Sequence, residues 1–225
     1  MIETGISYFG NRILRHFKTD LDDMAAHGCS YVVHTFSEND ARFYAGTMGE
    51  IVAATQAAGL EAWIDPWGVG GVFGGEAFSD YVAHFAADRQ VLSTGRATPA
   101  ACPNNPRFRD WMRQWVERAG ETGAEGIFRD EPHFFIPAWG RFYDGPLDAW
   151  ACRCRVCRSL FREQTGHEMP LKLTPEVHAF RQDCLLDFLD EMSHHAQALG
   201  ARNALCLLPA EEGAAAGLPW DRAAA

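Results

Sequence analysis

The stretch "YVVHTFSENDARFYAGTMGEIVAATQAAGLEAWIDPW", residues 31–67, decides the fold class of this chain. It opens with six residues of high β-propensity, continues with apolar residues at helical spacing over 39–58, and closes with an apolar strand over 60–67. We expect Asn39 to cap the helix and Gly59 to end it. A strand, a helix and a second strand in this order predict a βαβ unit with parallel strands.

The same alternation of strand and helix continues through the rest of the chain. Further apolar strands are predicted over 5–10, 125–132 and 203–209, so five strands are expected in all. Asn105 precedes a proline at the first position of one predicted helix, and Thr174 opens another, long and amphipathic helix. Five strands alternating with helices predict a parallel sheet, which both a doubly wound fold and a (β/α)8 barrel would satisfy.

Polar and aromatic side chains at the strand ends favour the barrel, because a barrel gathers the carboxyl ends of its strands at one face. No phosphate-binding glycine pattern follows the first strand, and "GVGGVFGG" (68–75) is predicted to be a flexible lid loop. The expected fold class is therefore α/β, of the (β/α)8 TIM barrel type. The side chains that end the strands are His34, Asp65, Trp67, Asp130 and Glu131.

The predicted barrel is incomplete, because the sequence supplies only about five βα units and a complete barrel takes about 250 residues. We expect residues 1–225 to form a single (β/α) barrel-type catalytic domain that is truncated at its C-terminus. An open half-barrel would expose a sheet edge, which favours association into a homo-oligomer.

The charge and composition of the chain exclude some partners. A net charge of −10, with no basic tract, argues against nucleic acid and against an anionic membrane surface. The N-terminus lacks the pattern of a signal peptide, and no apolar run is long enough for a membrane span. We therefore expect a cytoplasmic protein whose seven cysteines are thiols or metal ligands.

Three cysteines, Cys152, Cys154 and Cys157, lie within six residues in "CRCRVC". A disulfide would need an oxidising compartment, a redox pair would open a thioredoxin-like unit, and core thiols would not alternate with arginines. A tetrahedral zinc site explains the spacing better, but it needs a fourth ligand. Cys102 and His133 both qualify, and Cys102 is preferred because it lies in a loop near the same face. The remaining cysteines are assigned to the core or to the remote end of the sheet: Cys29, Cys184 and Cys206.

The segment over about 95–165 resembles the glycoside hydrolase family 42 β-galactosidases. It carries "CPNNPRFRDW", a strand that ends in an acidic pair, "CRCRVC" and a phenylalanine shortly after. The resemblance implies a retaining enzyme with a (β/α)8 barrel and catalytic glutamates on the fourth and seventh strands. It also implies a structural zinc, whose ligands here would be Cys102, Cys152, Cys154 and Cys157.

The acidic pair in "FRDEPHFF" lies at the end of the fourth predicted strand. By the resemblance, Glu131 matches the general acid and base, whereas Asp130 replaces an asparagine of the family. A second carboxylate would raise the pKa of Glu131 and keep it protonated, as an acid catalyst requires. The structural alternative is that both residues pair with Arg129, with Arg141 or with a helix N-terminus.

These features predict a carbohydrate as the partner and a retaining glycoside hydrolase as the function, with a structural zinc as the cofactor. The nucleophile on the family's seventh strand has no counterpart in the sequence. The alternative is a catalytically inactive, zinc-stabilised module that binds carbohydrate or another protein. A catalytic zinc is disfavoured, because four cysteines leave no open position on the metal. The residues expected to contact the sugar are Arg12, Asp65, Trp67, Arg129 and His133.

Overall fold

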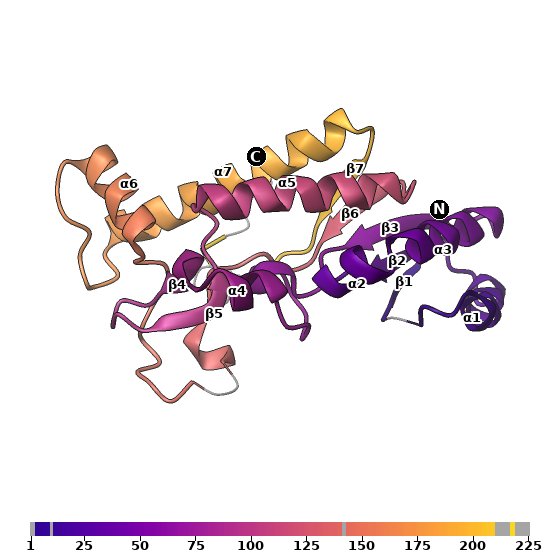
Figure 1. Ribbon diagram of the computed structural model, residues 1–225, viewed down its shortest axis with the longest axis horizontal. Coiled ribbons are helices and arrows are strands. Elements are labelled where there is room, and N and C mark those ends of the chain that lie inside the picture. The colour runs from indigo at the N-terminus through magenta and orange to yellow at the C-terminus, as the bar shows by residue number, and fades with distance from the viewer. Residues whose placement is uncertain (1–2, 10, 141–142, 210–216, 219–225) are drawn as a thin grey trace.

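A computed structural model describes residues 3–9, 11–140, 143–209 and 217–218. Its main sheet has five strands, all parallel, in the order β1-β2-β3-β6-β7 (Figure 1). The prediction of a parallel α/β sheet is thus confirmed, although the strands are shorter than expected. Their bounds are β1 Gly5–Tyr8, β2 Tyr31–Thr35, β3 Glu61–Asp65, β6 Gly126–Arg129 and β7 Arg202–Leu205.

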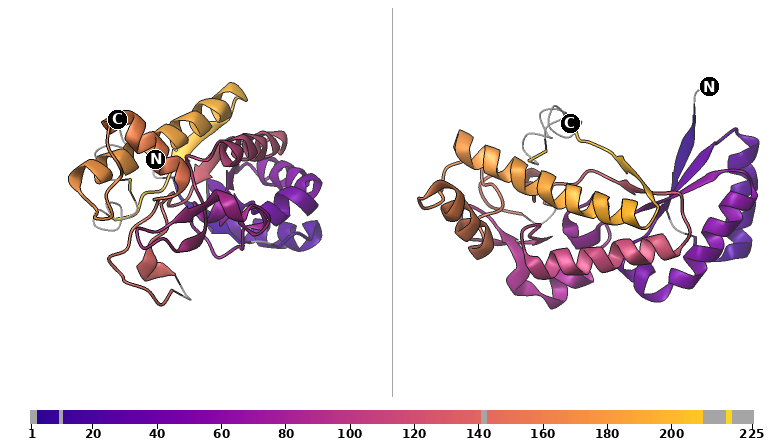
Figure 2. Two further views of the ribbon diagram at one scale, coloured as in Figure 1. Left: turned by 60° about the vertical axis from the view of Figure 1, so that its left-hand side comes forward. Right: turned by 90° about the horizontal axis from the view of Figure 1, so that it is seen from above.

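Helices connect the strands and carry the apolar side chains of the core. The two longest lie side by side in the views of Figures 1 and 2, and their buried side chains include Trp115 and Phe188. None of the helices in the described part of the chain has the length and apolarity that a membrane crossing requires. The helices are α1 Leu14–Ala26, α2 Glu38–Phe43, α3 Ala45–Ala57, α4 Asp80–His84, α5 Pro106–Glu121, α6 Arg155–Thr165 and α7 Pro175–Ala198; short 3-10 turns cover Val69–Gly71, Ala86–Asp88 and Pro137–Trp139.

The helix predicted over 39–58 differs from the observed one at its start and in its continuity. Ser37, not Asn39, is the cap: its hydroxyl accepts from the Asp40 N–H, and the Asp40 carboxylate accepts from the Ser37 N–H. This reciprocal pair is a capping box, which satisfies two backbone donors at once. The chain then leaves helical geometry at Tyr44, which divides the predicted helix into α2 and α3.

The segment between β3 and α5 contains an antiparallel hairpin, β4 Arg89–Val91 and β5 Ala97–Ala101, that the sequence interpretation missed. Its turn includes Gly95 at a φ of +88°, where glycine is favoured. The hairpin lies outside the parallel sheet and delivers Cys102 to the neighbourhood of α6. The cysteine-rich stretch and the hairpin are thereby brought together.

Glu38 anchors this segment to α2 from a buried position. Its carboxylate accepts from the N–H of Gly70 at 2.8 Å, the hydroxyl of Ser79 at 2.6 Å and the N–H of Tyr81 at 2.7 Å. Three hydrogen-bond donors from the segment between β3 and α5 thus contact a single side chain. Hydrogen bonds to a buried carboxylate are among the stronger ones in proteins.

We predict that Glu38→Ala lowers the free energy of unfolding by about 2–4 kcal/mol, because it leaves buried donors without an acceptor. Urea denaturation of the variant checks this. Glu50→Ala, which removes an exposed carboxylate from α3, is the matched control and should change stability by less than about 0.5 kcal/mol. Equal stability of the two variants would contradict the anchoring role.

Candidate active site and metal centre

The acidic pair lies at the carboxyl end of β6 and is held by its backbone on two sides. The Asp130 carbonyl accepts from the Gly74 N–H at 2.9 Å, and the Glu131 N–H donates to the Cys206 carbonyl at 3.1 Å. Glu131 has a φ of +39°, an unusual value for a residue with a side chain. The pair is therefore fixed between the glycine-rich segment and the residue that follows β7.

The glycine-rich segment, predicted to be a flexible lid loop, folds back on itself and packs against the acidic pair. The Gly68 N–H donates to the Gly74 carbonyl at 2.7 Å. A Cβ at Gly74 would lie 2.6 Å from Asp130 Oδ2, and one at Gly75 would lie 2.4 Å from the Trp67 ring. The glycines are thus required by the close approach of this backbone to the side chains at the strand ends.

Asp65, at the end of β3, is buried next to the acidic pair. Burial, and secondarily the charge of Asp130, raise the pKa of Asp65 to about 8, whereas a backbone hydrogen bond from Asp130 opposes the shift. Its Oδ1 atom is buried and has no hydrogen-bond partner among the described residues. Asp65 therefore has its carboxyl group in surroundings of low dielectric constant, at the carboxyl ends of the strands where the acidic pair also lies.

Glu131 opens onto a pocket of about 390 Å³ with polar and aromatic walls. Burial and the charge of Asp130 raise the pKa of Glu131, while burial lowers the pKa of His133. The His133 Nδ1 donates to the Glu131 carbonyl at 2.5 Å, and its ring meets that of Trp139 edge-on at 5.6 Å. The pocket thus combines a carboxyl group that favours its protonated form with a partly exposed indole. Other lining residues are Phe73, Gly74, Glu76, Pro99, Phe135 and Ile136.

Arg12 and Arg129, two of the expected sugar contacts, bond to the protein itself. Arg12 pairs with Asp40 at 2.9 Å and also donates to the Thr35 carbonyl, which ties the chain after β1 to the start of α2. Arg129 is buried and donates to Asn203 Oδ1 at 2.5 Å and to the carbonyl of Met192 at 2.9 Å, away from the pocket.

The remaining expected contacts differ in their positions. Trp67 lies beside the glycine-rich segment and meets Phe9 edge-on at 4.7 Å. Asp65 and His133 lie with the acidic pair, whereas Arg141 lies outside the described residues. His34, which also ends a strand, is buried, and its Nε2 lies 3.0 Å from the hydroxyl of Thr55 on α3. It is a core residue. The structure therefore assembles Asp65, Asp130, Glu131 and His133.

The four cysteines predicted as metal ligands form one buried cluster. The Cys102 Sγ lies 3.5 Å from that of Cys157 and 3.6 Å from that of Cys154, and the four sulfurs, including that of Cys152, lie within 4.8 Å of one another. Disulfide sulfurs would be about 2.05 Å apart, whereas sulfurs that share a tetrahedral metal ion at about 2.3 Å lie about 3.8 Å apart. The spacing therefore fits a metal centre.

The surroundings of the cluster also suit a metal ion. Mutual hydrogen bonds among the thiols raise the pKa of Cys102 and Cys157 and lower that of Cys154, so one thiolate is already favoured. The Asn104 amide donates to the Cys157 sulfur at 3.4 Å. Arg181, fully buried on α7, donates to the Ala151 carbonyl at 2.5 Å. The buried Arg181 guanidinium interacts electrostatically with Cys152 and Cys157, so it would offset part of the charge of thiolates that bind a metal ion.

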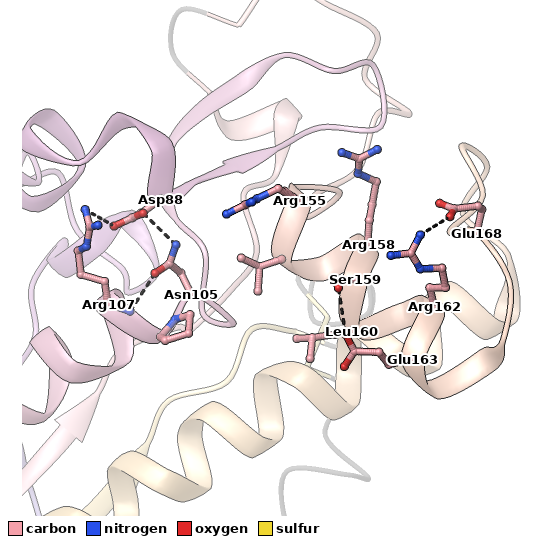
Figure 3. Close-up of a pocket in the computed structure, with 12 residues that line it drawn as sticks. Asp88, Asn105, Arg107, Arg155, Arg158, Ser159, Leu160, Arg162, Glu163 and Glu168 are labelled. Atoms are coloured by element: carbon pink, nitrogen blue, oxygen red, sulfur yellow. Dashed lines mark hydrogen bonds and ion pairs between the residues drawn. The ribbon is translucent and has the colours of Figure 1, made fainter.

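A larger cavity of about 890 Å³ lies between the start of α5 and α6, away from the acidic pair (Figure 3). Two ion pairs lie among its charged groups, Arg107 with Asp88 at 3.5 Å and Arg162 with Glu168 at 3.0 Å. Its carboxylates Asp88, Glu163 and Glu168 are each ion-paired or hydrogen-bonded, and no aromatic residue is among its described lining residues. The smaller pocket has an aromatic wall and a carboxyl group with a raised pKa, so we place the candidate active site at the carboxyl edge of the sheet.

The fold and the site define an α/β protein with part of a TIM barrel. No family model matches the chain, and no curated protein matches its sequence. Solved structures with the same fold include a chain of the pneumococcal virulence factor StrH (TM-score 0.54, 8% identity, covering 90% of this chain and 52% of that one), described for N-glycan recognition and hydrolysis.

Two further structures are similar to the chain to the same degree. They are a GH20 exo-β-N-acetylglucosaminidase from Vibrio harveyi (0.54, 11%, covering 90% and 35%) and a β-N-acetylhexosaminidase (0.54, 10%, covering 92% and 46%). The chain thus spans about half or less of the length of these structures. Its fold resembles the TIM barrels of glycoside hydrolases, and this resemblance does not single out the family 42 enzymes.

We predict one tightly bound divalent metal ion per chain, and its loss in Cys102→Ser, because three sulfurs cannot complete the tetrahedral shell. Metal analysis of the purified proteins by mass spectrometry, together with thermal unfolding, measures both effects. Cys29→Ser, which removes a thiol outside the cluster, is the control and should keep the metal. A metal-free wild-type protein, or a fully loaded Cys102→Ser protein, would refute the metal centre.

Proposed function

We propose that this protein is a glycoside hydrolase in which Glu131 is the general acid. The observation that carries the proposal is the position of Glu131 at the end of the fourth parallel strand, facing a pocket with Trp139 beside it. Burial and Asp130 raise the pKa of its carboxyl group, which favours the protonated form that an acid catalyst needs to protonate a glycosidic oxygen. The exposed indole of Trp139 offers an apolar face for a sugar ring.

A retaining reaction can follow one of two routes, which differ in the nucleophile and in the role of Asp130. In the route of the family 42 enzymes, a second carboxylate attacks the sugar, and it would come from outside the described residues. In the substrate-assisted route of GH20 enzymes, the 2-acetamido group of the substrate attacks instead. A carboxylate at Asp130, where family 42 has asparagine, favours the second route, because it can accept a hydrogen bond from the acetamide N–H and orient that group.

The metal held by the cysteine cluster is proposed to be zinc with a structural role. Four sulfur donors are typical of closed structural zinc sites, and the closed shell leaves no position for a reacting water. The centre would tie Cys102, after the β4–β5 hairpin, to the start of α6. The pocket wall would be stabilised indirectly, because the hairpin and the chain after Glu131 pack together through the hydrogen bond from the Phe135 N–H to the Gln90 side chain at 2.9 Å.

The wider proposal is a single barrel-type domain that binds carbohydrate and not nucleic acid or membrane. The likeness to family 42 over 95–165 remains part of the proposal, and the clustering of the four cysteine sulfurs within 4.8 Å of one another supports it. A reducing, cytoplasmic location is part of the proposal, and it is supported by the seven cysteines, all of them outside disulfides, of which four are proposed metal ligands. We also propose that the protein self-associates through the edge strands of its sheet. The alternative is an inactive carbohydrate-binding module, and the next experiment distinguishes it from an active glycoside hydrolase.

We predict that Glu131→Gln lowers kcat/KM by about 10²–10⁴-fold on glycosides with poor leaving groups, because the proton donor of the first step is lost. The loss should be much smaller on 2,4-dinitrophenyl glycosides, whose leaving group needs no proton. Kinetics on β-galactosides and on N-acetyl-β-glucosaminides give both ratios. Glu76→Gln, in the same pocket, is the control.

An equal loss on good and poor leaving groups would contradict the acid role of Glu131. Sugar binding by the wild-type protein with no turnover of either series would favour the inactive module.

Asp130→Asn separates the two routes. If the substrate assists, we predict a fall in kcat of about 10²-fold or more on N-acetyl-β-glucosaminides, since a preorganised acceptor is lost. The alkaline limb of the pH profile should also move to lower pH, because removal of the Asp130 charge lowers the pKa of Glu131. An unchanged rate and an unchanged limb would exclude Asp130 from the reaction.

A further inference from the structure

Cys206 lies beside the acidic pair, although the sequence interpretation assigned it to the core. The Cys206 N–H donates to the Arg129 carbonyl at 2.9 Å, and its own carbonyl accepts from the Glu131 N–H at 3.1 Å. This pairing of the ends of β6 and β7 brings together a thiol and two carboxylates. Ligand atoms of Asp130, Glu131 and Cys206 all lie within 4.8 Å of one another.

The buried carboxyl group of Asp65 lies beside Asp130, outside the set of three ligand atoms that lie within 4.8 Å of one another. Asp65 is only 4% exposed, and its Oδ1 atom is buried without a hydrogen-bond partner among the described residues. Its carboxyl group interacts with Asp130 both through charge and through a backbone hydrogen bond. An unpartnered buried oxygen is costly, and a cation held by the neighbouring Asp130, Glu131 and Cys206 would reduce that cost through its charge, without Asp65 being a ligand.

The nearby arginines do not compensate the charge of this group. Arg129 is directed to Asn203 and to the Met192 carbonyl, and Arg12 is paired with Asp40. Carboxylates thus converge with a thiol at one edge of the sheet, while both of these guanidinium groups bond elsewhere. This arrangement is distinct from the cluster of four cysteines, with which it shares no ligand.

We propose that Asp130, Glu131 and Cys206 form a second metal site, which takes a zinc-class divalent cation. A donor set of two carboxylates and one thiolate favours borderline metal ions over Mg²⁺ and Ca²⁺, which prefer oxygen alone. Three protein ligands leave a position open, so this site is weaker and more exchangeable than a closed one. Because the ion would occupy the carboxylate of Glu131, it displaces the proton there and inhibits the hydrolysis; this last effect rests on the proposed function.

Titration of the zinc-loaded full-length protein with Co²⁺ tests the site without substrate. We expect a further equivalent of Co²⁺ to bind with a sulfur-to-cobalt charge-transfer band. Cys206→Ser should abolish that band and weaken binding at least tenfold, whereas Cys29→Ser should match the wild type. A protein that binds no further equivalent, or a band that survives in Cys206→Ser, would overturn the site.

The inhibitory effect needs a separate measurement. Added Zn²⁺ should lower the hydrolysis rate of the wild type reversibly, and should act at least tenfold more weakly on Cys206→Ser, each relative to its own rate without added zinc. Equal sensitivity of the two proteins would overturn the inhibition. If neither protein hydrolyses any glycoside, the proposed function fails, and the Co²⁺ titration alone decides whether the metal site exists.

Discussion

The parallel register of β3, β6 and β7 is the constraint on which the rest of this structure depends. Trp63 pairs with Gly126, and Gly126 in turn pairs with Arg202, so the three strands end at the same level. Every group that we assign to chemistry follows directly from one of these ends. Asp65 ends β3, the acidic pair follows β6, and a thiol follows β7. The carboxyl edge of the sheet is therefore where charge, burial and an open pocket coincide.

Two buried polar centres hold the segments that surround this edge. Glu38 accepts three hydrogen bonds from the segment between β3 and α5, and the four-cysteine cluster joins the β4–β5 hairpin to the start of α6. Each centre joins residues that lie far apart in the sequence, and neither centre belongs to the repeating βα pattern. The walls of the pocket are thus set by long-range contacts, while its floor is set by the sheet.

Much of this arrangement could be predicted because it follows from periodicity and spacing. The five strands, the Asn105 and Thr174 caps and the grouping of Cys152, Cys154 and Cys157 are local or nearly local properties of the chain. Cys102 lies far away in the sequence, and it was assigned to the cluster from its loop position and from the family resemblance. The hairpin was missed because its strands are short and pair only with each other. The roles of Arg12, Arg129 and Cys206 depend on which neighbour each side chain meets, and only the packed structure supplies that information.

The central claim is that a sugar binds at the carboxyl edge of the parallel sheet, against Glu131. A crystal structure of the protein soaked with N-acetylglucosamine tests it most directly. The account predicts a sugar ring in the pocket of about 390 Å³, with a hydroxyl or the anomeric oxygen within hydrogen-bond distance of Glu131 and the ring beside Trp139. An empty pocket at saturating sugar, or a sugar only in the arginine-lined cavity between α5 and α6, would contradict it.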